Sequence, residues 1–448
     1  VYLLTREVMT PGHEELLHRR ARAAGVLVLR YPHDSTPTLE SVGDRVKVRY
    51  FDSTLGCERA IEADLVVEAA GAELIVDGWM EPVALENCTN ITIRGLTIDY
   101  KRPPYSIGTV VNVWDGYFDV KYGSEYPLTT GMPIPRVTLW DPEADRMVGK
   151  ECFYPEKKRR IGPQTLRLFA AVPISALNQL ALCNHSFHFR PAVFIHQAEK
   201  ITLEKFTIHS QPGMGVIGHR SRNLTFRNLR IVPRAGSVMS TNTDATHFTS
   251  CSGYILFEGC QFEGQGDDST NIHNYYYSIF PDESGGSAGR AKTCEIRVES
   301  PGGTHAQVLD YPDPGDILEL VEKKTLRVVD MVEVIEVEND PVNWKSLITL
   351  DRELTVPLEE YYLINISRLP RVRIINCSVR SHRARAFLIK TRDVLIEGCT
   401  IENTTGTAIH VGAEGWWHEG PGSADVKILF NRIIHCGFGE GIQNCLLY

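Results

Sequence analysis

The sequence lacks the features that would place this protein in a membrane or on a nucleic acid. No apolar run reaches the roughly 18 residues that a membrane-spanning helix needs. Lysine and arginine number 47 against 56 aspartates and glutamates, which gives a net charge of −9. Because nucleic acids and anionic membranes select basic surfaces, we expect neither of them as a partner.

Metal-type cysteine pairs are also absent. None of the eleven cysteines forms a C-x-x-C pair. Several of them fall at one position of the repeat described below, which predicts buried, reduced, structural thiols and argues against a disulfide framework.

The chain begins at Val1 with neither an initiator methionine nor the apolar segment of a signal peptide. We therefore expect a processed or incomplete chain. Export to the periplasm or the medium is the favoured localisation, with the signal peptide absent from this sequence. The apolar fraction of 43% is that of an ordinary soluble globular protein, and 448 residues leave room for several domains.

What the sequence does contain is a weak internal repeat. Each copy has a polar residue, a short run of alternating apolar and polar residues, and a further apolar pair. Copies occupy residues 90–98, 200–208, 223–231 and 254–262, and later ones begin at Val372, Val394 and Val426. Cys260, Cys377 and Cys399 share one position of the unit. The alternation predicts strands with one buried face.

The spacing of the copies predicts the architecture. Neighbouring copies start 22 to 32 residues apart, apart from two gaps of more than 100 residues. Short strands at such a period, joined by turns and without a helical pattern between them, are typical of a solenoid of strands. We predict an all-β fold, a right-handed parallel β-helix.

The two long gaps contain alternating strands of their own, for example at 108–113 and 332–337. Both gaps are predicted to be small inserted antiparallel β (barrel-like) modules. An amphipathic helix is predicted at 12–24. The expected division is into N-terminal coils or a cap, the first module, central coils with the acids, the second module and C-terminal coils: 1–101, 102–190, 191–276, 277–368 and 369–448.

Two acidic strings lie one repeat length apart. Asn242-Thr243-Asp244 precedes Gly266-Asp267-Asp268 by about 23 residues. If residues 233–240 form a loop that absorbs eight extra residues, Asp244 and Asp267 stack on adjoining coils about 4.8 Å apart. Stacked like charges are unfavourable, so a fold that accepts them has a reason in chemistry, although aspartate is also a common turn residue.

Gathered carboxylates are the equipment of a glycoside hydrolase. One protonated carboxyl protonates the leaving oxygen, and one carboxylate activates water or attacks the sugar. Asp244, Asp267 and Asp268 are therefore predicted to be catalytic. The spacing alone does not choose between inversion and retention. Nearby Asn271, His247 and His273 are predicted to bind substrate.

A second cluster spans residues 414–420. Trp417 could stack on a sugar ring while Glu414 and Glu419 accept its hydroxyl groups, the composition of a carbohydrate pocket. An aromatic loop that covers an open end of the β-helix is an equally good interpretation.

Taken together, these residues resemble glycoside hydrolase family 110, a family of exo-acting α-1,3-galactosidases. The resemblance rests on the coil units, the spacing of the acids, Asn271-Ile272-His273 and the Trp417-x-Glu419-Gly420 string, and it runs from about residue 85 onward. It implies a parallel β-helix with inserted barrels, hydrolysis with inversion, and no metal or other cofactor.

The resemblance also implies roles. Asp267 would be the general acid, and Asp244 and Asp268 would hold and activate water. The expected reaction is the release of terminal α-linked galactose, most simply α-1,3-linked, from an oligosaccharide or glycan. A homodimer is a possible assembly.

Three alternatives stay open. A polygalacturonase-like hydrolase shares the acids, but it should add Gly-His-Gly one coil later and Arg-Ile-Lys after that. The chain has no Gly-His-Gly and only an imperfect echo of the second motif at 388–390, and its sequence does not indicate the basic cleft that a uronate needs. A non-catalytic carbohydrate-binding β-helix would not need the acids in register. A polysaccharide lyase would need calcium or a basic residue beside them.

Overall fold

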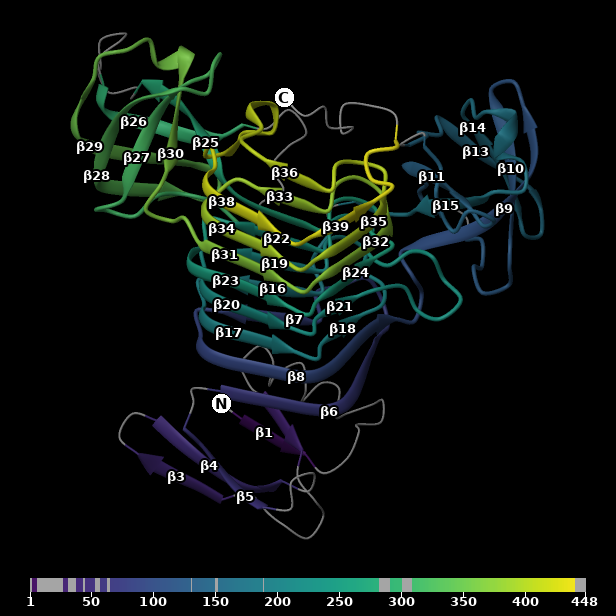
Figure 1. The fold of residues 1–448 in the computed structure, drawn as a ribbon, viewed down its shortest axis with the longest axis horizontal. Coiled ribbons are helices and arrows are strands. Elements are labelled where there is room, and N and C mark those ends of the chain that lie inside the picture. Colours follow the sequence, from purple (N-terminus) through teal and green to yellow (C-terminus); the bar gives the residue numbers. More distant parts are fainter. Residues whose placement is uncertain are drawn as a thin grey trace.

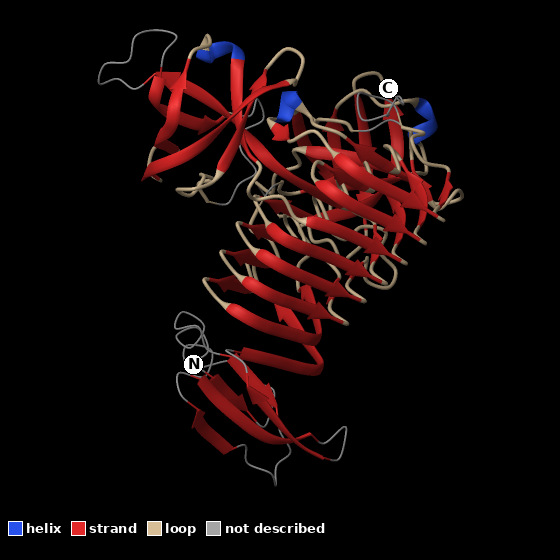
Figure 2. Ribbon diagram, turned by 60° about the vertical axis from the view of Figure 1, so that its left-hand side comes forward, coloured by secondary structure: helices blue, strands red, loops and turns tan. Residues whose placement is uncertain are grey.

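The computed structural model describes residues 65–129, 131–149, 152–187, 189–281, 291–299 and 308–439, and the backbone of five strands before them. The helix predicted at 12–24 lies outside the described residues. In the described part of the chain the helices are three short 3-10 turns, η1 (Ile174–Ala176), η2 (Leu358–Glu360) and η3 (Gly415–Trp417). None of these is long and apolar enough to cross a bilayer. Strands dominate, as predicted (Figure 2).

The N-terminal strands form two small groups. β1 (Tyr2–Thr5) pairs in parallel with β2 (Leu27–Arg30). The strands β3 (Thr38–Val42), β4 (Arg45–Asp52) and β5 (Cys57–Glu62) form an antiparallel sheet.

The central body is a parallel β-helix, which confirms the predicted fold class (Figure 1). One wall contains the repeat strands. They are β6 (Leu65–Val76), β8 (Thr89–Tyr100), β17 (Glu199–Glu204), β20 (Arg222–Arg227), β23 (Ser252–Glu258), β31 (Arg371–Ile375), β34 (Arg392–Glu397) and β38 (Ala424–Leu429). The predicted copies stack in register, since Ile201, Leu224 and Ile255 pair in sequence and Val372, Val394 and Val426 continue the row.

Two further walls complete each coil. The second contains β18 (Thr207–Ile208), β21 (Arg230–Ile231), β24 (Gln261–Glu263), β32 (Ser378–His382), β35 (Thr400–Thr404) and β39 (Arg432–Ile434). The third contains β7 (Val83–Glu86), β16 (Val193–His196), β19 (Val216–His219), β22 (Thr246–Thr249), the start of β25 (Thr270–Pro281), β33 (Phe387–Ile389) and β36 (Ile409–Val411). The acids lie in the turns that lead into β22 and β25 of this third wall.

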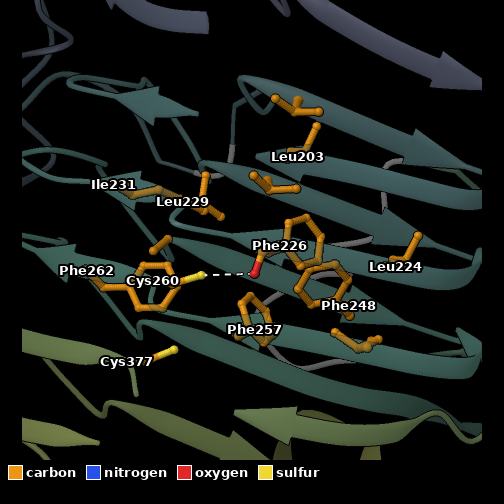
Figure 3. Packing of buried hydrophobic residues seen from close by; sticks show 14 of the residues in the cluster. Leu203, Leu224, Phe226, Leu229, Ile231, Phe248, Phe257, Cys260, Phe262 and Cys377 are labelled. Atoms are coloured by element: carbon orange, nitrogen blue, oxygen red, sulfur yellow. Dashed lines mark hydrogen bonds between the residues drawn. The ribbon is translucent and has the colours of Figure 1, made fainter. Parts of the chain in front are cut away.

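Apolar side chains from the three walls fill the interior. Phe226, Phe248 and Phe257 pack ring against ring with centroids 5.0 to 5.8 Å apart (Figure 3). Cys260 lies at the same phase as Cys377, is buried, and its Sγ contacts the Phe226 carbonyl at 3.3 Å. These cysteines are free thiols, as predicted.

The first inserted module is an antiparallel sheet with its own core. Its seven strands are β9 (Tyr105–Trp114), β10 (Tyr117–Tyr122), β11 (Arg136–Asp141), β12 (Arg146–Met147), β13 (Lys157–Gly162), β14 (Thr165–Phe169) and β15 (Leu180–Asn184). Met239, from a loop of the β-helix, packs into this core, and its carbonyl accepts a hydrogen bond from the Tyr105 hydroxyl at 2.6 Å. That contact fixes the module against the loop that precedes Asp244.

The second module is a closed six-stranded barrel. It contains the end of β25 together with β26 (Ala291–Val298), β27 (Ile317–Glu322), β28 (Val328–Asp340), β29 (Lys345–Leu354) and β30 (Tyr361–Asn365), and both β26 and β30 pair with β25. β25 therefore begins in the β-helix and ends in the barrel without a break. Figure 1 shows the two modules on opposite sides of the C-terminal half of the stack. The domain boundaries drawn from the sequence stay predictions.

Candidate active site

The register of the third wall places the acids. Thr246 pairs with Thr270, an offset of 24 residues, and the Ala245 N–H donates to the Asp268 carbonyl at 2.9 Å. Asp244 is thus in register with Asp268. The predicted stacking of Asp244 on Asp267 is wrong by one residue.

The cause lies in the loop before Asp244. Arg230 pairs with Gln261 at an offset of 31 residues, so the segment between that pair and Thr246 absorbs seven extra residues, where eight were predicted. The alternation of a strand does not define the length of a loop, and a shift of one residue turns a side chain to the other face of a strand.

All three predicted acids nevertheless come together. One carboxylate oxygen from each of Asp244, Asp267 and Asp268 lies within 4.8 Å of the others. Asp244 and Asp268 are buried, whereas the Asp267 side chain is 20% exposed. We call this group the carboxylate trio. Asp267 is its most accessible member.

Asp267 lies between two guanidinium groups. Arg383 Nη1 is 2.8 Å from its Oδ2, and Arg136 Nη1 is 3.7 Å from the same atom. Arg136 comes from β11 of the first module and also donates to the carbonyls of Asn242 (2.6 Å) and Gly266 (2.9 Å). A residue of the inserted module therefore holds both acidic turns of the β-helix.

Asp268 is bound by Arg385, which follows it in the same row of the next coil. Its carboxylate accepts hydrogen bonds from the Arg385 backbone N–H (2.8 Å), Nε (3.2 Å) and Nη2 (3.1 Å). Burial, together with the charges of the neighbouring Asp267 and Asp244, raises the pKa of Asp268 to about 7, although the charge of Arg385 acts in the opposite direction.

Asp244 faces a pair of histidines. Its Oδ2 is 2.8 Å from His247 Nδ1, and His247 Nε2 is 2.9 Å from His273 Nε2. Burial, with the charges of Asp267 and Glu419, raises the pKa of Asp244 well above its usual range. Burial lowers the pKa of His247 to about 4 and that of His273 to about 3.

The aromatic string lies beside the trio. β37 (Glu419–Gly420) pairs antiparallel with β25 at Asn274 and Tyr275, immediately after the acids. The backbones of Glu414 and Glu419 pair with each other across η3. Trp417 is partly exposed in that turn, and its backbone N–H donates to the Glu414 carbonyl at 3.1 Å. A stacking role for its ring stays a prediction.

Lys390 joins the two predicted clusters. Its Nζ is 2.8 Å from Glu414, 2.7 Å from Glu419 and 3.0 Å from Asn271 Oδ1, and its side chain is fully buried. Glu419 also accepts from Asn271 Nδ2 at 3.0 Å and lies 3.6 Å from His273 Nε2. Although burial opposes it, Lys390 and then Arg385 lower the pKa of Glu414 to about 2. Burial opposes the ionised form of Glu419 as well, but Lys390, 2.7 Å away, holds the pKa of Glu419 well below its usual range.

Sequence reasoning missed the basic half of this site. The sequence did not indicate a basic cleft, yet four cationic side chains lie among the acids: Arg136, Arg383, Arg385 and Lys390. The only sequence feature that pointed to Lys390 was the string at 388–390, an imperfect match to the Arg-Ile-Lys motif of polygalacturonase-like hydrolases. The arginines belong to no sequence motif, because their contact with the acids depends on which coil or module packs beside them.

Two triads have donor atoms close enough for a metal ion. They are the carboxylate trio and the group formed by His247, His273 and Glu419, each with atoms within 4.8 Å of one another. Arginine side chains already balance Asp267 and Asp268, and Lys390 already balances Glu419. We assign no metal to either group, and the expectation of a metal-free, cofactor-free site stays a prediction.

Similarity to known proteins points the same way as the geometry. An α-1,3-galactosidase B from Bacteroides thetaiotaomicron is 27% identical over 398 residues, which cover 82% of this chain and 62% of that protein. An α-1,3-galactosidase A from Bacteroides fragilis is 26% identical over 443 residues, with 93% and 70% covered. The chain is related to bacterial α-1,3-galactosidases. The predicted resemblance is confirmed.

The matches with these relatives cover only part of the relatives' length. The chain spans about 62% of the first of these relatives, and 64% of a third, an α-1,3-galactosidase A from Shewanella woodyi that is 26% identical to it over 409 residues. No protein-family model matches the chain. Among solved structures, a mannuronan C-5 epimerase A-module from Azotobacter vinelandii aligns over 82% of this chain and 78% of its own, with 7% identity and a TM-score of 0.20. At that TM-score the likeness supports no conclusion about this chain.

Proposed function

We propose that the protein is a glycoside hydrolase that releases terminal α-1,3-linked galactose from oligosaccharides or glycans. The observation that carries the proposal is the carboxylate trio, with Asp267 accessible between two buried partners. The names of the relatives supply the substrate class.

The proposed reaction uses two of the three carboxyl groups. A protonated carboxyl gives its proton to the glycosidic oxygen as the anomeric C–O bond breaks, and a carboxylate takes a proton from the water whose oxygen forms the new bond. Two oxygens that share one hydrogen-bonded water are about 4.5 Å apart. The separations within the trio, at most 4.8 Å, suit two acids that hold one water between them. They are shorter than the about 6.5–9.5 Å usual between the acid and the base of an inverting enzyme, so the proposed stereochemistry rests on the family resemblance and not on this spacing. We propose inversion, as the family resemblance implies.

The remaining predicted site residues form the wall of the site. His247, His273, Asn271 and Glu419 are buried and bonded to protein groups, which favours a supporting role over direct contact with sugar. The partly exposed Trp417 keeps its proposed role as the stacking ring.

The basic side chains bear on the alternative substrate. They would suit a uronate if they offered uncompensated positive charge. Arg136 and Arg383 contact Asp267, however, Arg385 contacts Asp268 and Glu414, and Lys390 contacts Glu414 and Glu419. Their charges therefore offset those of the acids, which favours a neutral galactoside.

Steady-state assays of the wild type, Asp267→Asn and Asp145→Asn test the proposal. The substrates are p-nitrophenyl α-galactoside, α-1,3-galactobiose and polygalacturonate. We expect galactose release, and a loss in kcat of at least about 10²-fold in Asp267→Asn, the usual contribution of general acid–base catalysis. The exposed Asp145, paired with Arg380, is the control and should leave kcat unchanged.

The outcomes separate the alternatives. Release from polygalacturonate alone would favour a uronate hydrolase, and glycan binding without release from any substrate would favour a binding protein. Proton NMR of the first-formed sugar tests the stereochemistry. β-Galactose is expected, and α-galactose as the first product contradicts inversion.

A further inference from the structure

The first module has a face that the proposed hydrolysis does not use. Its strands β9, β10, β14 and β13 lie next to one another in that order, and β13 is the edge strand of the sheet. Figure 1 shows β10, β13 and β14 on the outer side of the module, beyond β11 and β15. Two rows of side chains cross these strands on the face opposite the module's core, and we call them together the module face. The first row is Trp114, Tyr117, Phe169 and Lys157, and the second is Asn112, Asp119, Arg167 and Arg159.

The first row consists of aromatic rings and ends on a cation. Trp114 pairs with Tyr117 across β9 and β10, and Phe169 pairs with Lys157 across β14 and β13. Ring centroids are 4.9 Å apart between Trp114 and Tyr117, and 5.9 Å apart between Tyr117 and Phe169. Trp114 is 42% exposed, and Lys157 Nζ lies 4.4 Å from the centre of the Phe169 ring. The row therefore offers a strip of apolar ring surface to the solvent.

The second row is polar and holds the rings in place. Arg167 binds the buried Asp119 carboxylate through Nε (2.8 Å) and Nη2 (3.0 Å), and Asn112 Nδ2 donates to the same carboxylate at 3.3 Å. Arg167 Cζ lies 4.3 Å from the centre of the Tyr117 ring and 5.0 Å from that of Trp114. Because this guanidinium is fixed by a buried carboxylate, the two rings are ordered before any ligand arrives.

The edge strand adds positive charge that nothing nearby offsets. Lys157, Lys158, Arg159 and Arg160 are consecutive and exposed. No carboxylate in the described part of the chain forms an ion pair with any of these four residues. Arg159 also lies directly opposite Arg167. Like charges at directly opposed positions destabilise a sheet, so this arrangement costs stability in the absence of an anion.

Protection of the sheet edge does not explain the whole arrangement. Charged side chains on an edge strand prevent two sheets from pairing, which is one reason for their presence on β13. That role requires charge, but it requires neither a single sign nor aromatic rings on the neighbouring strands. A surface that combines exposed ring area with uncompensated charge of one sign is typical of a binding site.

We infer that the module face binds an acidic glycan, a sugar chain that carries sulfate esters or carboxylates. The apolar side of a sugar ring would lie on Trp114, and the anionic group would accept hydrogen bonds from Arg159 and Lys157. The net charge of −9 disfavours a nucleic acid, which carries a charge on every nucleotide. The choice of a glycan among polyanions rests on the proposed function.

Isothermal titration calorimetry of the full chain tests the inference at low ionic strength, where exposed charges are least screened. The probes are dextran sulfate, polygalacturonate and unmodified dextran. We expect at least one acidic polymer to bind and dextran, which lacks the charge of dextran sulfate, not to bind. Binding of dextran sulfate alone assigns a sulfate ester to the ligand, and binding of polygalacturonate alone assigns a carboxylate. Binding of neither overturns the inference.

Matched variants locate the binding. Lys157→Gln/Arg159→Gln should raise Kd at least about fivefold, the combined effect of two exposed charge contacts. Trp114→Ala, which leaves the charge unchanged, should raise Kd at least about threefold through the lost ring contact. Arg371→Gln/Lys427→Gln removes two exposed charges from the first wall of the β-helix, and it should change Kd less than about twofold.

The variants can also contradict the inference. If the double variant of the module face has no larger effect than the control, the binding site lies elsewhere. An unchanged Kd in Trp114→Ala would reduce the binding to a general attraction of charges and overturn the inference as well. Trp114→Leu, which keeps apolar volume without the ring, repeats this test if alanine alters the circular dichroism spectrum. A thymidine oligonucleotide that binds more tightly than both acidic polysaccharides would assign the face to nucleic acid and overturn the glycan.

Binding is measured without turnover, so the two proposals fail separately. An active α-galactosidase that binds no acidic polysaccharide at the module face would refute this inference alone. A protein that binds one there but releases no galactose would refute the hydrolase proposal alone.

Discussion

Replacement of Lys390 by methionine should destabilise the protein in a pH-dependent way. The ammonium group is fully buried and lies within 3.0 Å of Glu414, Glu419 and Asn271. Methionine keeps the apolar stem and the approximate volume but leaves two largely buried carboxylates without their main counter-charge.

The magnitude follows from the pKa of Glu414. Lys390 and Arg385 hold that pKa at about 2, against an ordinary 4.5, a difference that corresponds to about 3 kcal/mol at neutral pH. Removal of one partner from a buried ion pair typically costs about 3–5 kcal/mol. We therefore expect Lys390→Met to lower the free energy of unfolding by about 3–5 kcal/mol at about pH 7.

The cost should shrink as the pH falls. In the wild type, the lowered pKa of Glu414 contributes stability that is present above pH 4.5 and is lost as the pH falls toward about 2. In the variant, the carboxylates take up protons more readily on acidification, which relieves their repulsion. The difference between the two proteins should therefore shrink throughout acidification and be smallest near pH 2, where Glu414 of the wild type is protonated as well.

Urea unfolding at several pH values measures this difference. Lys390→Met/Glu419→Gln should recover part of the loss, because it removes one unpaired charge. Lys101→Met is the control, since its pair with Asp77 is exposed and should be worth less than about 1 kcal/mol. A loss in Lys390→Met no larger than in this control, or one that does not vary with pH, would refute the reasoning.

Two further predictions concern the arginines. Arg136→Met should lower kcat/KM at least about tenfold, because it removes the side chain that holds both acidic turns. A tenfold loss corresponds to about 1.4 kcal/mol of transition-state stabilisation. Steady-state kinetics, with an unchanged circular dichroism spectrum as the check on folding, measure this loss, and an unaffected kcat/KM would contradict a catalytic contribution from the first module. Arg385→Met should raise the pKa of Asp268 above its value of about 7, because it removes the main charge that lowers this pKa. If activity needs ionised Asp268, the acid limb of the kcat/KM profile should move to higher pH. A limb that stays in place would exclude that need.

Much of the fold could be read from local patterns. The alternation at 200–208, 223–231 and 254–262 predicted strands, and their common spacing predicted the stacked coils that the register confirms. The strands could be predicted because every second residue of a strand points to the buried face, so the pattern is visible among neighbouring residues. The two long gaps in the repeat likewise predicted the inserted modules.

The acids show where that information ends. Their proximity followed from the repeat, but the pairing of Asp244 with Asp268 depended on how many residues the preceding loop absorbs, which only the strand pairings on either side of it reveal. Loop residues have no periodicity, so the sequence could not give the register to better than one residue.

What the sequence by itself determined was therefore the solenoid, its insertions and the gathering of three acids on one wall. Only the tertiary structure decided what surrounds them. Arg136 reaches the site from an inserted module, and Lys390 joins Glu414 and Glu419 from a neighbouring coil. An ion pair depends on distance in space, and residues on different coils or modules, such as Lys390 and Glu419 at 29 positions apart, leave no local trace of the partner they will meet.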